Sequence, residues 1–183
     1  MHLKIQEILD ELSWVFASST LAGEARLVET IISAGTVVCA GAGRVGLATA
    51  GFAKRLGHLG KEAFWIGDTT LPRTGTGDLM FISSGSGETR SIVTIGEVAK
   101  QNGLTIALLT CTDDSTLSRL ADVQVTLNCP SKLNAEKEKM SKQPMTTLFE
   151  QACQIYLDSI VLELMAVTGR SEIEMMGRHN AIE

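Results

Sequence analysis

Aromatic residues, prolines and positive charge are all scarce in this sequence. Of its 183 residues, only 4% are aromatic and three are prolines, and 16 lysines and arginines stand against 21 aspartates and glutamates, for a net charge of −5. Nucleic-acid surfaces need clustered positive charge and, for single strands, stacking aromatic rings. We therefore expect no nucleic-acid partner, and any anionic ligand must be bound by local groups.

Long apolar runs and paired cysteines are also missing. No stretch approaches the roughly 20 apolar residues of a membrane helix, and acidic residues interrupt the segment 1–16 where a signal peptide would need an apolar core. The four cysteines stand far apart with no CxxC pair, which argues against a zinc ribbon or a disulfide framework. These features predict a cytoplasmic protein with reduced thiols, no membrane partner and no bound metal.

Apolar residues and glycines are plentiful instead. Hydrophobic residues make up 44% of the chain, enough to offset the entropy of ordering it, and 17 glycines indicate tight turns and close backbone contacts. After two helices at 1–16 and 24–34, apolar runs alternate with helical patterns. The runs predict strands at 36–40, 62–66, 79–83, 104–110 and 123–127, and the patterns predict helices at 46–59, 88–101 and 115–120. Such alternation is typical of an α/β fold with a doubly wound, five-stranded parallel sheet flanked by helices.

The C-terminal third combines a polar segment with a long apolar helix. Residues 128–143 contain four lysines and two glutamates and are interpreted either as a lid or as a plain connection. The helix expected at 144–167 is apolar on most of its circumference, which favours an oligomer interface. Ser171 and Glu174 have the spacing of a capping box and predict a last short helix. No linker is evident, so we expect one domain over 1–183 with helical extensions at both ends.

Two glycine-rich turns follow strands, where open parallel sheets bind their ligands. The first, residues 41–46 (GAGRVG), has the GxGxxG spacing of dinucleotide sites, but the acidic residue at the required distance, Glu62, precedes the second strand instead of ending it. The alternative interpretation is that these glycines serve close packing of helix and strand. The second turn, residues 84–89 (SGSGET), offers three hydroxyls and helix-start amides to a phosphomonoester, and lacks the Gly-Lys-Ser/Thr of a nucleotide P-loop. The alternative is a hydroxyl-rich helix cap without a ligand.

These turns, together with FAKRLGHLG at 52–60, QPMTTLFEQ at 143–151 and the terminal GRHNAIE, resemble the sugar isomerase (SIS) domain family, and within it the 6-phospho-3-hexuloisomerases. The resemblance extends over nearly the whole chain and implies a flavodoxin-like sheet. It also implies interconversion of 3-hexulose 6-phosphate and fructose 6-phosphate, a step of the ribulose monophosphate route of formaldehyde fixation, without metal or other cofactor. Members are typically homotetramers, here with sites expected near subunit interfaces.

Carried over by motif, the resemblance assigns roles to particular residues. It implies Glu150 as the catalytic base, and a phosphate site made of Ser84, Gly85, Ser86, Gly87, Glu88 and Thr89. Arg44 and Val45 belong to the substrate-binding set, although Val45 replaces a family serine, so that a hydroxyl contact is missing there. Of the histidines, His58 is favoured over His179 as an assisting group, in its own site or in that of a neighbouring subunit.

The expected mechanism is an enediolate proton transfer between adjacent carbons of a ketose 6-phosphate, with Arg44 or His58 stabilising the oxyanion. Because no residue at i±3 or i±4 from Glu150 is basic, the acid is expected to be unpaired. Three alternatives stay open. The chain would be an isomerase of a pentose or heptose phosphate, a non-catalytic sugar-phosphate sensor, or, least favoured, a nicotinamide-dependent reductase.

Overall fold

The computed structural model describes residues 2–130 and 141–182. Most of the polar segment 128–143 therefore lies outside the described residues, and its interpretation as lid or connection stays a prediction. The division into one domain with helical extensions likewise stays a prediction.

The core of the fold is a sheet of five parallel strands in the order β2-β1-β3-β4-β5. The strands are β1 (Thr36–Gly41), β2 (Glu62–Trp65), β3 (Leu79–Ser83), β4 (Thr105–Thr110) and β5 (Val123–Thr126). This is the strand order of flavodoxin-like proteins. The predicted doubly wound five-stranded sheet is confirmed.

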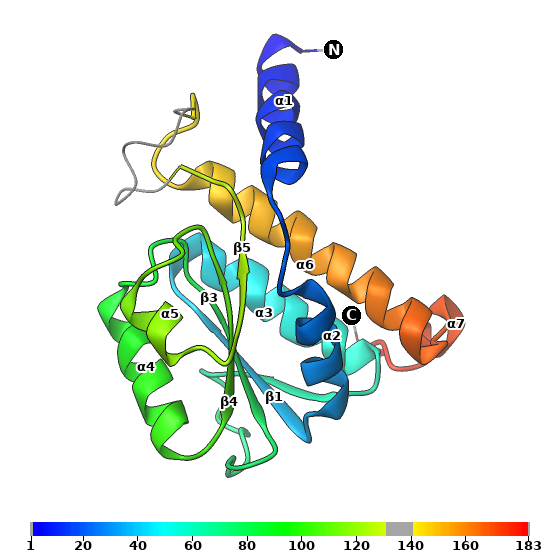
Figure 1. Cartoon of the computed structure of the whole chain (residues 1–183). Helices are drawn as coiled ribbons and strands as arrows, with labels where there is room; N and C mark the ends of the chain where they lie inside the picture. Colours follow the sequence, from blue (N-terminus) through cyan, green and yellow to red (C-terminus); the bar gives the residue numbers. More distant parts are fainter. Residues whose placement is uncertain (1, 131–140, 183) are drawn as a thin grey trace.

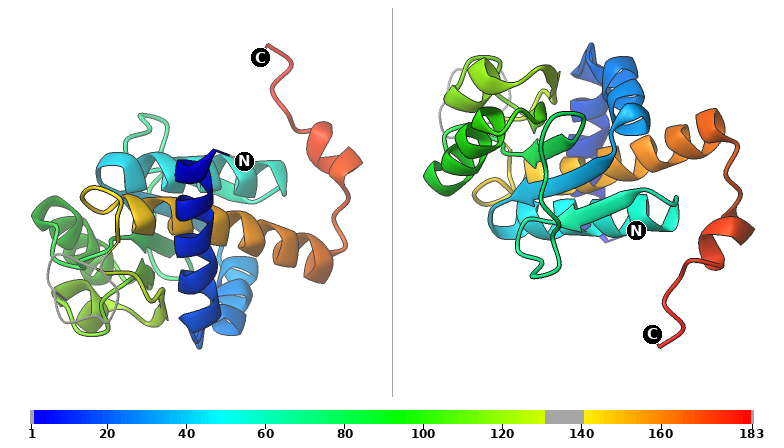
Figure 2. Two further views of the ribbon diagram at one scale, coloured as in Figure 1. Left: turned by 90° about the horizontal axis from the view of Figure 1, so that it is seen from above. Right: turned by 90° about the horizontal axis from the view of Figure 1, so that it is seen from below.

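Seven helices accompany the sheet in the described part of the chain (Figure 1). They are α1 (Leu3–Ser18), α2 (Glu24–Ser33), α3 (Gly43–His58), α4 (Arg90–Gln101), α5 (Thr116–Leu120), α6 (Thr147–Thr168) and α7 (Glu172–Met176). Helices α4 and α5 cover one face of the sheet, and α2, α3 and α6 cover the other. Helix α1 stands apart from the sheet and crosses α6 (Figure 2).

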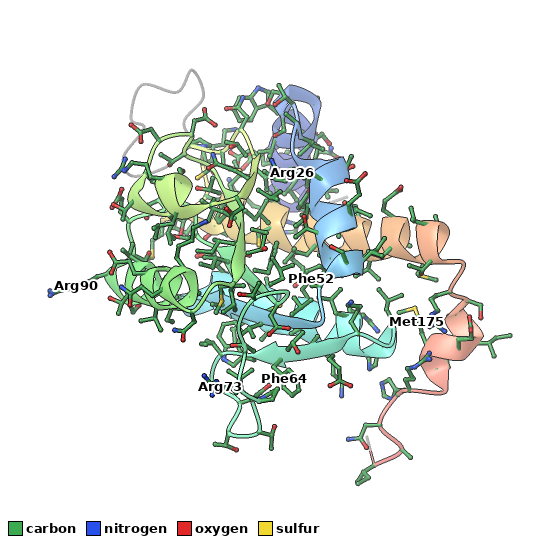
Figure 3. All side chains as sticks on the ribbon, turned by 60° about the horizontal axis from the view of Figure 1, so that its bottom comes forward. Arg26, Phe52, Phe64, Arg73, Arg90 and Met175 are labelled. Carbon is green, nitrogen blue, oxygen red and sulfur yellow. The ribbon has the colours of Figure 1, made fainter. Side chains whose placement is uncertain are left out.

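Alternation along the strands separates two apolar cores. In β3, Phe81 points to the core under α3 and α6, and Ile82 to the core under α4 and α5. Phe52 of α3 packs on Phe81 with a distance of 5.2 Å between ring centroids, and Figure 3 shows it inside the molecule. Burying such a ring contributes about 1.5–3 kcal/mol. Strands buried on both faces explain why their sequences read as continuous apolar runs.

Helix α3 begins three residues earlier than predicted, at Gly43 instead of Gly46. The reason is that Gly43 adopts φ +59°, which lets the chain turn directly from β1 into the helix. A Cβ on Gly46 would lie 2.8 Å from the carbonyl oxygen of Gly41, so this glycine permits close packing of helix on strand. Arg44 and Val45 consequently lie in the first turn of α3 and not in a loop.

Three smaller expectations concern the cap of the last helix, membrane-spanning helices and the cysteines. The capping box before α7 is confirmed, since Ser171 Oγ accepts from the Glu174 N–H and the Glu174 carboxylate accepts from the Ser171 N–H. Among the described residues, no helix combines the length and the apolar character needed to cross a membrane. All four cysteines are described, buried and outside any disulfide.

Candidate functional site

A cavity of about 310 Å³ lies at the carboxyl ends of β1 and β3. These neighbouring strands continue into helices on opposite faces of the sheet, and ligands bind at such switch points in doubly wound folds. The cavity brings together three segments that are distant in the sequence: the start of α3, the turn formed by residues 84–89 after β3, which we call the serine turn, and the start of α6. Its lining residues are Ala42, Gly43, Arg44, Val45, Ser83, Ser84, Gly85, Ser86, Thr89, Thr146, Phe149 and Glu150.

The serine turn is held by its own hydroxyl groups. The Gly87 N–H donates to Ser84 Oγ and the Glu88 N–H donates to Ser86 Oγ, both at 3.2 Å. The sequence predicts that amides near the helix start are offered to a phosphate. The amides of Gly87 and Glu88 are instead bonded to serine side chains, which fold back onto them. Within the described part of the chain no side chain caps α4, which begins at Arg90. The Ile92 N–H donates to the Thr89 carbonyl, which leaves the amides of Arg90 and Ser91 to donate at the helix start.

The carbonyl of Gly85 fixes the orientation of the turn. It accepts from Thr110 Oγ1 at 3.2 Å, from Cys111 Sγ at 3.0 Å and from Thr112 Oγ1 at 3.1 Å, all at the end of β4. In a trans peptide the C=O and the next N–H point in opposite directions. The N–H of Ser86 is therefore directed away from β4. A Cβ on Gly85 would lie 2.9 Å from the Phe149 ring, so only glycine lets the turn approach α6 this closely.

Glu150 lies in the first turn of α6 with its side chain 14% exposed, and it is paired. Arg44 Nη1 lies 2.7 Å from Glu150 Oε2, and Thr146 Oγ1 donates to Glu150 Oε1 at 3.1 Å. The expectation of an unpaired acid is wrong. The partner comes from α3, and spacing within one helix reveals no contact between two helices.

Arg44 occupies the mouth of the same cavity. Its side chain is 62% exposed, and besides the ion pair it donates to Thr147 Oγ1 at 3.3 Å. Solvent screens a pair with one exposed partner, so it contributes little to stability. The ion pair matters for the site because it places a guanidinium and a carboxylate side by side at the entrance of the cavity.

Other residues of the predicted site are placed differently. Val45 is buried, and its apolar side chain forms part of the cavity wall. Gly87 and Glu88 do not line the cavity. The Glu88 carboxylate accepts from the N–H and the hydroxyl of Thr116 at 2.7 and 2.8 Å, and these hydrogen bonds lower the pKa of Glu88. Glu88 thus binds the first residue of α5 and is turned away from the cavity. Arg90, at the start of α4, extends outward into solvent (Figure 3).

His58 lies at the opposite end of α3 from Arg44. At 1.5 Å per residue the two are separated by about 20 Å along the helix axis. His58 is buried, with its ring 5.3 Å from that of His179 and its Nδ1 3.4 Å from Arg55 Nη1. It therefore does not reach the cavity of its own chain, and action in a neighbouring subunit's site stays a prediction.

Five lining residues were not assigned to the site from the sequence: Ala42 and Gly43 of the first glycine-rich turn, and Ser83, Thr146 and Phe149. For Thr146 a signal existed, since it stands four residues before Glu150 and a threonine hydroxyl at that spacing can donate to a carboxylate. Considering only basic neighbours of Glu150 missed it. Ser83 ends a buried strand and Phe149 has helical core spacing, so neither pattern distinguishes a cavity wall from ordinary core.

Comparisons with known proteins identify the family of the chain and the group of enzymes it resembles. The SIS domain model matches residues 30–153. The chain is 34% identical to the 3-hexulose-6-phosphate isomerase of Bacillus subtilis over 98% of this chain and 97% of the relative. It is 36% identical to that of Mycobacterium gastri over 86% and 78%.

A crystal structure of a hypothetical protein from Methanococcus jannaschii has the same architecture. It aligns with a TM-score of 0.83 and 28% identity over 98% of this chain and 99% of that one, and a molecular function of 3-hexulose-6-phosphate isomerase was inferred for it. Sequence and structure comparisons thus lead to the same group, and the chain belongs to the SIS domain family.

Proposed function

We propose that this protein is a sugar-phosphate isomerase that interconverts 3-hexulose 6-phosphate and fructose 6-phosphate. The observation that carries the proposal is the single cavity that holds the serine turn and the Glu150 carboxylate together. The relatives named 3-hexulose-6-phosphate isomerase support the choice of substrate.

The serine turn supplies the phosphate site in this proposal. Hydroxyls of Ser84, Ser86 and Thr89 surround the phosphate oxygens, and the uncapped start of α4 contributes amides and the positive end of a helix dipole. Ser84 and Ser86 accept from turn amides through their oxygens, so their O–H groups remain to donate to the phosphate dianion. Remote phosphate binding then supplies energy for positioning the reacting carbons.

Glu150 acts as the base. It removes the proton from the carbon that carries the hydroxyl next to the carbonyl, which leaves an enediolate, and returns it to the neighbouring carbon. Arg44, which contacts Glu150 Oε2, is the donor placed to stabilise the developing oxyanion. Thr146 orients the carboxylate through Oε1. The hydroxyl oxygen loses its proton as it becomes the new carbonyl, and the former carbonyl oxygen gains one, so the sugar is neither oxidised nor reduced overall. While Glu150 holds the carbon-derived proton, that proton can exchange with solvent.

Replacing Ser86 by alanine is expected to weaken substrate binding more than turnover. A hydrogen bond to a charged group contributes about 1.5–3 kcal/mol, so KM should rise roughly tenfold to a hundredfold. Steady-state kinetics with fructose 6-phosphate measure this, with Ser91→Ala in the first turn of α4 as a comparison. Unchanged KM and kcat would remove the turn from the site.

Incubation with fructose 6-phosphate in deuterated water tests the function itself. We expect solvent deuterium at the carbon next to the carbonyl and a 3-ketose product, detected by NMR. Tight binding without exchange would instead identify a non-catalytic sugar-phosphate sensor.

One observation favours a second substrate class. Val45 gives the cavity wall a buried methyl surface where the family resemblance implies a serine. We infer that a pentose or heptose phosphate is the alternative, and the same exchange experiment with those sugars compares them. The homotetramer with sites near subunit interfaces and the cytoplasmic location stay predictions, and sedimentation analysis tests the former.

A further inference from the structure

Glu11 of α1 is the only carboxylate that the structure buries among the described residues, with 5% of the residue exposed. Neither the phosphate site nor the proton transfer uses it, and it precedes the matched SIS region, which begins at residue 30. A buried charge is costly unless hydrogen bonds compensate it. Its partners therefore indicate what the residue does.

The described partners of Glu11 come from three consecutive residues. Oε1 accepts from the Lys142 N–H at 2.7 Å, and Oε2 accepts from Ser141 Oγ at 2.7 Å and from Gln143 Nε2 at 3.0 Å. Ser141 Oγ in turn accepts from the Gln143 N–H at 3.0 Å. Hydrogen bonds to an ionised acceptor are the strong ones, so residues 141–143 are clamped onto α1. We call this contact the Glu11 clamp.

The clamp is separated from the reactive carboxylate by a short, strained turn. After Gln143 come Pro144, Met145 and Thr146, and Thr146 Oγ1 donates to Glu150. Met145 has φ +56° although it is not glycine, which costs about 1–2 kcal/mol. Its side chain is 84% exposed, so burial does not offset that cost. Neighbouring contacts must hold the turn, and the clamp fixes its N-terminal side.

The same face of α1 reaches the site from a second direction. Ile8, about one turn before Glu11, and Leu12, the residue after it, line a cavity of about 540 Å³ together with Arg44 and Glu150. Helix α1, which stands apart from the sheet in Figure 1, thus adjoins the Arg44–Glu150 pair. This contact is independent of the clamp and places α1 beside the reactive groups.

We propose that Glu11 is a positioning residue for Glu150: the Glu11 clamp sets the turn 144–146, and through Thr146 it sets the direction of the carboxylate. The proposal rests on the proposed isomerase function, because it gives Glu150 the role of the base. It assigns to α1 a part in catalysis beyond packing.

Glu11→Gln tests the proposal, because it keeps the shape but turns one acceptor into a donor that faces other donors. We expect kcat to fall by about tenfold to a hundredfold, since small misplacements of a reacting group have effects of this order. KM should stay within about twofold, because the serine turn is untouched. The matched control is Asp10→Asn on the same helix, because the Asp10 carboxylate is exposed and accepts from Gln6 Nε2 of α1 at 2.7 Å.

Hydrogen exchange gives a readout that does not depend on activity. In Glu11→Gln the amides of Lys142 and Glu150 should exchange faster by about tenfold or more, whereas those of residues 84–87 should not change. Gln143→Ala, which removes one donor and leaves the carboxylate, should show a smaller effect of the same kind if Glu11→Gln does not fold.

Each result decides between the alternatives. A fall in kcat with constant KM and faster exchange at 142 and 150 supports the proposal. Unchanged kcat overturns it, whatever the exchange rates. Equal losses in kcat and in phosphate binding, measured with inorganic phosphate, also overturn it, because they indicate general unfolding. If the unmodified protein converts no sugar phosphate, the proposed function is wrong. Faster hydrogen exchange in Glu11→Gln would then show only that the Glu11 clamp stabilises the structure.

Discussion

Glu150→Gln should lower the turnover of fructose 6-phosphate by about a hundredfold to ten-thousandfold, the usual contribution of a positioned base. The amide has nearly the same shape as the carboxylate but cannot accept a proton from carbon. Affinity for the sugar phosphate should change little, because the serine turn makes the phosphate contacts. The thermal midpoint should also change little, since the Arg44 guanidinium is 62% exposed and water can solvate it when the ion pair is lost.

Comparison with Glu163→Gln separates catalysis from helix effects. Glu163 lies on the same helix, α6, but is exposed and does not line the site cavity. The Glu163→Gln variant should retain the activity of the unmodified protein. Single-turnover deuterium exchange then isolates the proton-transfer step in both variants. Full activity of Glu150→Gln would mean that another group is the base.

Gly87→Ala should lower the stability of the protein markedly. Gly87 has φ +65°, and an added Cβ would lie 2.0 Å from Ser115 Oγ and 2.5 Å from Ser115 Cβ. The left-handed backbone costs about 1–2 kcal/mol for a residue with a Cβ, and overpacking costs about 1–3 kcal/mol more. At about 2–4 °C for each kcal/mol in a chain of this size, the thermal midpoint should fall by roughly 4–20 °C.

The damage should extend to the phosphate site. Ser115 caps α5 by accepting from the Ser118 N–H at 3.1 Å, and the Gly87 carbonyl accepts from the Leu117 N–H at 3.2 Å. Moving Ser115 disturbs both contacts and shifts the serine turn. Binding of inorganic phosphate, measured by calorimetry below the unfolding transition, should therefore weaken as well.

A second glycine provides the matched control. Gly51 lies in α3, and a Cβ there would have no atom of residues 2–130 or 141–182 within 4 Å. Because alanine is favoured over glycine in helices by about 1 kcal/mol, Gly51→Ala should keep or raise the midpoint. Equal thermal midpoints for Gly87→Ala and Gly51→Ala would contradict the prediction, because they would show that the close contact of Gly87 with Ser115 tolerates an added methyl group.

The serine turn and the sheet could be predicted from the sequence because both depend on local patterns. Apolar runs of strand length and glycines at strand ends indicate a parallel sheet, and SGSGET can be read in one segment. The start of α3 was misplaced, because a φ of +59° at Gly43 leaves no trace that distinguishes it from the glycines beside it. Glu88 was included in the site for its position in the turn, whereas its carboxylate binds Thr116 on the next helix.

By itself, the sequence determined that a hydroxyl-rich turn follows a buried strand of a doubly wound sheet and that an acid begins a long apolar helix. Only the tertiary structure decided which groups meet there. It paired Glu150 with Arg44, took His58 to the far end of α3 and joined Glu11 to residues 141–143. Periodicity reports the neighbours within one element, whereas these contacts join elements distant in the sequence, and chain packing alone brings them within hydrogen-bond distance.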